Sequence, residues 1–164
     1  MTPPGAGTGA EASLPADVRY VAFRALDAMA ETVRALGDER VNDRPALPGA
    51  NAPFAIVTHC VGVLDWWCGH LLAGRTVDRD RDAEFRATGT VEDLLARIEA
   101  AKAQLDRDLA AAGTADGPLA EPPVDYRFDD DVVLTRQRVL LHVLEELCRH
   151  HGHLDLTRDI LLHG

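Results

Sequence analysis

Histidine and glutamate residues near the end of the chain have the spacing of metal ligands. Five of the seven histidines lie between His142 and the C-terminus. On a helix of about 3.6 residues per turn, His142, Glu146, His150 and His153 fall within one quarter of the circumference. Imidazole nitrogens and carboxylate oxygens are groups that bind zinc and similar divalent ions. A buried carboxylate among imidazoles is costly unless a cation compensates it, so this stripe predicts a metal site.

The direction of the stripe distinguishes two neighbouring glutamates. Val139 and Val143 lie among these polar residues, so the stripe is expected to face a protein interior. Glu145 falls on the opposite side, where it can pair in water with Arg149 at spacing i, i+4. We expect no such cation beside Glu146. Glu146 rather than Glu145 is therefore the predicted ligand.

A third ligand is expected from an earlier helix, because zinc normally takes at least three protein ligands. His59 lies on one helical face with Ile56 and Val63, in a segment that is mostly apolar. Glu146 and His150 are one turn apart and supply the other two ligands. The sequence therefore predicts a metal site made of His59, Glu146 and His150.

Other aromatic residues are candidates for roles around this site. The sequence leaves several roles open for His142 and His153. Each could accept a proton in catalysis, orient a metal ligand, act as an alternate ligand or line a pocket wall. His70 has no identifiable partner on the chain, which favours a hydrogen-bonded core residue. Trp66 and Trp67 follow the predicted histidine ligand by one to two turns. They are expected to pack the core and are also candidates for lining a substrate pocket.

Sequence motifs of several other chemistries are absent. The chain has no H-E-x-x-H of a zinc protease, no Glu-x-x-His of a di-iron bundle, and no phosphate loop or dinucleotide fingerprint. Its three cysteines, Cys60, Cys68 and Cys148, form no C-x-x-C pair. We expect them to be reduced packing residues rather than nucleophiles, in a protein of the cytoplasm.

The charge of the chain argues against two classes of partner. The formal net charge is −10, and lysine and arginine never cluster. Nucleic acid and membrane surfaces are therefore not expected as partners. We also expect no membrane span, since no apolar run approaches the roughly 18 residues that one needs. A homodimer stays an open alternative, because a short bundle can cover apolar surface in this way.

Hydrophobic periodicity and helix-ending residues predict an all-α fold, a four-helix bundle in a single domain spanning residues 14–164. Residues 1–13 are expected to be a flexible leader. The 75–88 segment alternates acids and bases without an apolar stripe, which is typical of a solvated loop. The four helices are expected at about residues 14–37, 53–74, 91–113 and 136–162.

Two segments carry a resemblance to a known family. The first runs HCVGVLDWW from His59, and the second combines His142, the Glu145-Glu146 pair, Arg149-His150 and Gly152-His153. Over about residues 17–163 the chain resembles the DinB-like superfamily, in particular its actinobacterial branch with the metal-binding domain of mycothiol-dependent maleylpyruvate isomerase. The resemblance implies a four-helix bundle with one metal ligand from the second helix and two from the last. Those positions are His59, Glu146 and His150.

The resemblance also implies an activity. Relatives are thiol S-transferases in which zinc, nickel or a similar divalent ion activates mycothiol or bacillithiol. The expected function is therefore a metal-dependent transfer of such a small-molecule thiol, as co-substrate, to an electrophile. His142 and His153 are then the candidate catalytic residues, and Trp66 and Trp67 the candidate thiol-binding residues. Two alternatives remain open, a metal-dependent hydrolase that uses the same site and a non-catalytic metal-binding stress-response module.

Overall fold

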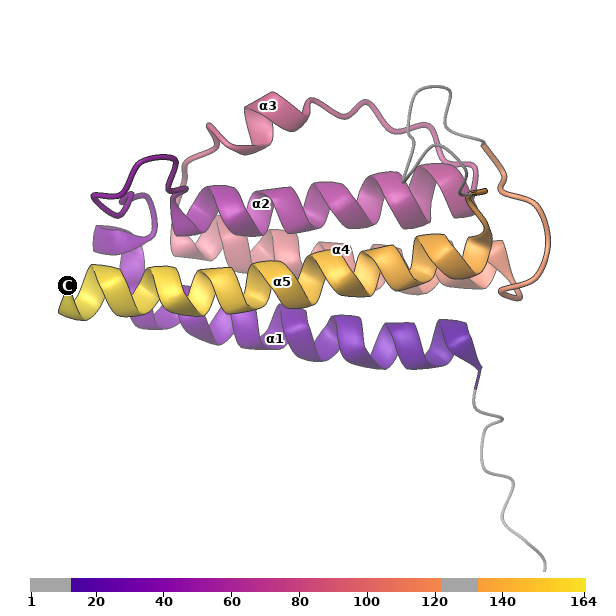
Figure 1. The fold of residues 1–164 in the computed structure, drawn as a ribbon, viewed down its shortest axis with the longest axis horizontal. Coiled ribbons are helices and arrows are strands. Elements are labelled where there is room, and N and C mark those ends of the chain that lie inside the picture. Colours follow the sequence, from indigo (N-terminus) through magenta and orange to yellow (C-terminus); the bar gives the residue numbers. More distant parts are fainter. Residues whose placement is uncertain (1–12, 122–132) are drawn as a thin grey trace, which may run out of the picture.

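Four long helices form the bundle in the computed structural model, which describes residues 13–121 and 133–164. Across these residues the structure contains helices and no strands, so the predicted all-α fold is confirmed (Figure 1). The expected leader, apart from Ser13, lies outside the described residues. The elements are α1 (Leu14–Arg40), α2 (Pro53–Leu64), a π-helical continuation of α2 called η1 (Asp65–Leu72), the short α3 (Arg81–Glu84), α4 (Val91–Ala112) and α5 (Arg136–His163).

The helix ends follow capping residues that the sequence predicts. Ser13, Thr90 and Thr135 each accept a hydrogen bond from the backbone N–H three residues later, at the starts of α1, α4 and α5. Gly37, with a φ of 64°, interrupts α1 where its end was predicted, and one more turn follows. Gly113, with a φ of 72°, ends α4. These stops set the lengths over which the helices can pack.

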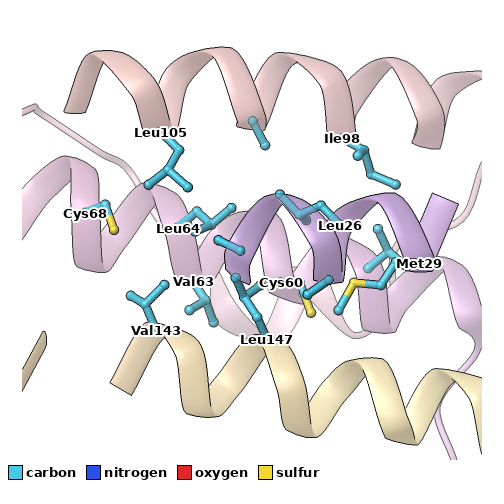
Figure 2. Close-up of a cluster of buried hydrophobic side chains, with 14 of the residues drawn as sticks. Leu26, Met29, Cys60, Val63, Leu64, Cys68, Ile98, Leu105, Val143 and Leu147 are labelled. Atoms are coloured by element: carbon cyan, nitrogen blue, oxygen red, sulfur yellow. The ribbon is translucent and has the colours of Figure 1, made fainter. Parts of the chain in front are cut away.

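The core lies between the apolar faces of the long helices. α1 packs most extensively against α5, while α2 contacts α5 and η1 contacts α4. Figure 2 shows side chains from all four long helices pointing toward one another. This packing holds α2 and α5 side by side, which places the predicted metal ligands on facing surfaces. The residues labelled in that view are Leu26, Met29, Cys60, Val63, Leu64, Cys68, Ile98, Leu105, Val143 and Leu147.

The second long helix is more apolar than the sequence pattern indicated. Residues Pro53–Leu72 form a continuous helix of 20 residues, and an 18-residue window within it has a mean hydropathy of 1.2, so by length and composition alone the helix is long and apolar enough to cross a membrane. The expectation that no apolar run has this length was wrong. Within the bundle, however, 67% of this window is buried against the other helices. A helix at the centre of a protein core is apolar on most of its surface because other helices cover it, so its composition resembles that of a membrane-spanning helix.

The end of this helix is wound as a π-helix, a rare form that is frequent at functional sites. Gly69 in η1 leaves room for Arg75, because a Cβ on Gly69 would lie 2.7 Å from the Arg75 Cζ. Arg75 donates hydrogen bonds to Asp65 at 2.6 Å and to the buried Asp108 of α4 at 3.0 Å. These ion pairs tie η1 to α4 and hold the turn that carries both tryptophans.

The connection from residue 73 to 90 crosses the outer side of α2 and contains α3 (Figure 1). The sequence predicted a solvated loop here, and that prediction was wrong in part. Asp80 caps α3 by accepting a hydrogen bond from the Ala83 N–H. Glu84, at the end of α3, is only 7% exposed. The connection therefore brings an acidic side chain inward, against the face of α2 that carries His59.

Candidate metal centre

Three side chains from two helices converge between α2 and α5. His59 projects from α2, whereas Glu146 and His150 project from α5. Glu146 Oε2 lies 3.5 Å from His59 Nε2 and 3.5 Å from His150 Nε2. One ligand atom from each residue lies within 4.8 Å of the other two. The structure thus brings together the three residues that the sequence predicts as metal ligands.

The distances and the proton positions both fit a divalent ion. Atoms bound to zinc at about 2.0–2.2 Å in a tetrahedral site lie about 3.4 Å apart, close to the 3.5 Å of both pairs here. His59 Nδ1 is 2.8 Å from Glu84 Oε2, and because an ionised carboxylate only accepts, Nδ1 carries the proton. His59 Nε2 then presents a lone pair to the Glu146 carboxylate. A cation between these two acceptors would make the contact favourable.

His150 supplies a neutral imidazole to this cluster. Burial lowers the pKa of His150, and the nearby His59 lowers it further, while the charge of Glu146 partly offsets both. Its Nδ1 is buried and has no hydrogen-bond partner among the residues that the structure describes. Buried polar atoms are normally paired. The nitrogen that faces the cluster is the other one, Nε2, at 3.5 Å from Glu146 Oε2, and in a neutral ring protonated on Nδ1 it presents a lone pair to an ion.

Glu146 faces inward as predicted, but the prediction for Arg149 was incomplete. The side chain of Glu146 is 13% exposed, against 57% for Glu145. Arg149 pairs with Glu145 and also donates to Glu146 Oε1 at 2.8 Å, because it is one turn from both. Burial alone would raise the pKa of Glu146, but its electrostatic interactions with His150 and Arg149 hold that pKa below its ordinary value. Glu146 is therefore a carboxylate at neutral pH, with Oε2 facing the imidazoles.

Glu84 is a member of this site that the sequence did not predict. Its Oε2 accepts the His59 Nδ1–H, and both of its oxygens accept from Arg79, at 2.6 and 3.0 Å. Burial would raise the pKa of Glu84, yet these hydrogen bonds from His59 and Arg79 hold it below its ordinary value. No periodic signal marks Glu84, since it lies in a segment of alternating charges. Only the path of the chain over α2 brings it to His59.

A pocket of about 320 Å³ opens beside the three residues. Its wall includes His59 and Glu146, so the metal cluster is accessible from this side. Trp66 and Trp67 line the same pocket, as the sequence suggested, although Trp67 is only 3% exposed. His142 also lines it, with its ring centroid 4.4 Å from that of Trp67. The remaining lining residues are Val63, Arg79 and Arg81.

The other two candidate histidines lie away from this pocket. The ring centroid of His153 is 6.0 Å from that of His150, and His153 lines a separate groove beside Leu156 and Ile160. His70 donates from Nδ1 to the Arg75 carbonyl at 3.0 Å, in agreement with the predicted hydrogen-bonded role. Of the candidate catalytic histidines, the structure brings only His142 into the pocket beside the cluster.

The cysteines differ in accessibility, which gives a first testable prediction. Cys60 and Cys68 are buried, while Cys148 is exposed. Burial raises the pKa of Cys60, with Glu146 adding to the effect, and burial raises the pKa of Cys68 to about 12. Since thiolate is the reactive form, we expect DTNB to label Cys148 alone in the native protein and all three thiols after denaturation. Cys148→Ser should remove the native signal, and a second thiol that reacts equally fast would contradict the burial described here.

Comparison with known proteins places the chain in a family. The family model described as mycothiol-S-transferase matches residues 20–162. The matched span contains the three clustered residues and both tryptophans. Comparisons with curated proteins and with solved structures give no match. Because the family model covers nearly the whole chain and agrees with the resemblance seen in the sequence, the chain belongs to the mycothiol S-transferase family.

Proposed function

We propose that this protein transfers mycothiol, or a closely similar small thiol, to an electrophilic carbon with the help of a divalent ion held by His59, Glu146 and His150. One observation carries the metal part of this proposal: the three side chains converge beside a pocket whose wall includes two of them, His59 and Glu146. Family membership supports the thiol part. The electrophile is a small molecule whose identity stays open.

Zinc is the ion that this ligand set favours. Two imidazoles and one carboxylate, with a position left for a further ligand, are typical of catalytic zinc sites. A divalent ion held here would lower the pKa of a thiol from about 8.5 and so supply thiolate at neutral pH. Glu146 contributes a single negative charge, and the two histidines are neutral as ligands. A divalent ion held by these three residues would therefore keep a net positive charge, which would favour the thiolate form of the co-substrate.

The pocket residues bind and orient the reactants. Trp66 and Trp67 offer aromatic surface against which the carbon framework of the thiol can pack. Burial lowers the pKa of His142, with Glu146 and Glu145 opposing the shift, so its imidazole is neutral at pH 7 and can accept the thiol proton. As the sulfur–carbon bond forms, the leaving group departs with its electron pair. The proton passes from His142 to water.

The thiol requirement gives the experiment that tests this function. Zinc-loaded protein is mixed with monochlorobimane and, in turn, mycothiol, bacillithiol, glutathione or cysteine, and conjugate fluorescence is followed. We expect mycothiol to give the fastest reaction, because contacts away from the sulfur position it for attack. His150→Ala, loaded in the same way, is the control for the uncatalysed rate. If the wild-type rate matches that control with every thiol, the protein is not an S-transferase for this class of electrophile.

A further inference from the structure

His59 is held from outside the bundle by one carboxylate. Glu84 comes from the 73–90 connection, 25 residues along the chain from His59, and its Oε2 is 2.8 Å from His59 Nδ1. Both side chains are almost fully buried, with 4% and 8% of their surfaces exposed. Phe85, the next residue, stacks on the His59 ring with a centroid separation of 4.7 Å. The connection thus contacts His59 through a hydrogen bond at the ring edge and through an aromatic contact on the ring face.

Glu84 is itself fixed by two features on either side. Arg79 binds both carboxylate oxygens, and its side chain is only 14% exposed, which makes this pair less screened than a surface ion pair. On the other side Gly62 of α2 leaves space for the carboxylate. A Cβ on Gly62 would lie 2.7 Å from the Glu84 Cδ and would overlap Oε1. Glycine inside a helix is less favourable than alanine, so a requirement for space explains its presence here.

We propose that Glu84 is a positioning residue for the metal ligand His59, and that Arg79 and Gly62 hold Glu84 in place for this task. The inference rests on the proposed function only in taking His59 as a ligand. By accepting the Nδ1–H, Glu84 fixes the tautomer whose lone pair lies on Nε2, which faces Glu146 and His150. A carboxylate on the far nitrogen of a histidine ligand also raises its basicity and thereby its affinity for the ion.

The contacts also couple the connection to the metal site. An ion bound to His59 Nε2 holds the ring in the orientation that Glu84 and Phe85 contact, so the ion stabilises the packed connection. By thermodynamic reciprocity the packed connection stabilises the bound ion to the same degree. Arg86 is exposed just beyond these contacts, which makes it a site where trypsin can report on local opening.

Zinc affinity measured by competition with a chelating dye tests the inference. We expect Glu84→Gln and Glu84→Ala to weaken zinc binding by about 10- to 100-fold, the usual effect of losing such a partner. Gly62→Ala should weaken it in the same way, although residue 62 contacts no ligand atom, because the added methyl displaces the Glu84 carboxylate. Glu84→Gln keeps the size of the side chain, so its fold is checked against wild type by circular dichroism.

Two matched variants control for charge and for helix propensity. Asp82→Asn removes one charge from the same connection, and Asp82 is exposed. Gly152→Ala makes the same change as Gly62→Ala in a helix, at a position where a Cβ would meet no atom within 4 Å. Both should bind zinc as tightly as wild type. The d–d absorption bands of cobalt-substituted protein should change in Glu84→Gln and stay the same in Asp82→Asn.

Two outcomes separate this inference from the proposed function. If His59→Ala loses zinc while Glu84→Gln and Glu84→Ala bind it like wild type, the positioning role is overturned and the metal site stands. If His59→Ala itself binds zinc like wild type, the proposed metal site fails and the positioning role fails with it.

Added zinc should slow trypsin cleavage after Arg86 about tenfold in wild type but not in Glu84→Gln. Equal slowing in both proteins would overturn the coupling.

Discussion

Zinc binding is expected to fall sharply in each of His59→Ala, Glu146→Ala and His150→Ala, and to stay at the wild-type level in Glu145→Ala. Each of the three substitutions leaves two protein ligands, and zinc sites use at least three. Glu145 has the same chemistry as its neighbour and contacts Arg149, but its side chain is 57% exposed and it is not one of the three clustered residues. The measurement is elemental analysis of protein purified without an affinity tag, after dialysis against limiting zinc.

The pair Glu145→Ala and Glu146→Ala is the sharpest part of this test. Both variants remove one carboxylate and one contact of the same arginine, so their effects on charge and on α5 are closely matched. Only Glu146 presents an oxygen, Oε2, to the two imidazoles. Equal metal loss from both variants would show that net charge, rather than coordination by Glu146, retains the ion.

Removing the metal is expected to abolish thiol transfer while leaving the helices intact. The core is built from buried apolar side chains of all four long helices, and the three clustered ligand residues are not part of it. Zinc binding to the folded state adds only about 4 kcal/mol to the free energy of unfolding at a zinc concentration one thousand times the Kd. For a chain of this size that corresponds to a Tm increase on the order of 10 °C.

Circular dichroism with and without a strong chelator measures this effect, and the bimane assay follows activity on the same samples. Restoring zinc to the chelated protein should restore both the Tm and the rate, which controls for damage by the chelator. Loss of far-ultraviolet helicity at room temperature on chelation would contradict the expectation. The ion would then be required for folding, as in small zinc domains.

The metal ligands could be predicted because helical periodicity determines direction. In α5 the 3.6-residue repeat predicts that Glu146 faces the interior and Glu145 faces solvent, and in the structure Glu146 is largely buried while Glu145 is exposed. The repeat does not determine which residues on one face lie level with a partner helix. His153 shares the face of Glu146 but lies seven residues further along, a rise of about 10 Å. It therefore lines a different groove.

Glu84 and η1 could not be predicted for a different reason. The contact between Glu84 and His59 depends on how an irregular connection crosses α2, and a run of mixed charges contains no information about that path. The π-helical η1 is joined to α4 through Arg75, which pairs with Asp65 of η1 and with the distant Asp108. Arg149 was assigned to one glutamate although it lies one turn from two. That contact has the i, i+3 spacing of neighbours on one helix, so the sequence already contained it, whereas the contact of Glu84 with His59 and the pairing of Arg75 with Asp108 join side chains that meet only in the folded chain.

The position of the tryptophans gives this protein an internal optical probe. Trp66 and Trp67 are the only tryptophans in the chain, and both line the pocket beside the metal cluster. Light absorbed selectively by indole is therefore emitted from one place in the molecule. Any compound that enters the pocket changes the water and the polarity around these two rings. Intrinsic emission can thus be titrated directly with candidate thiols and electrophiles, without a label and without turnover.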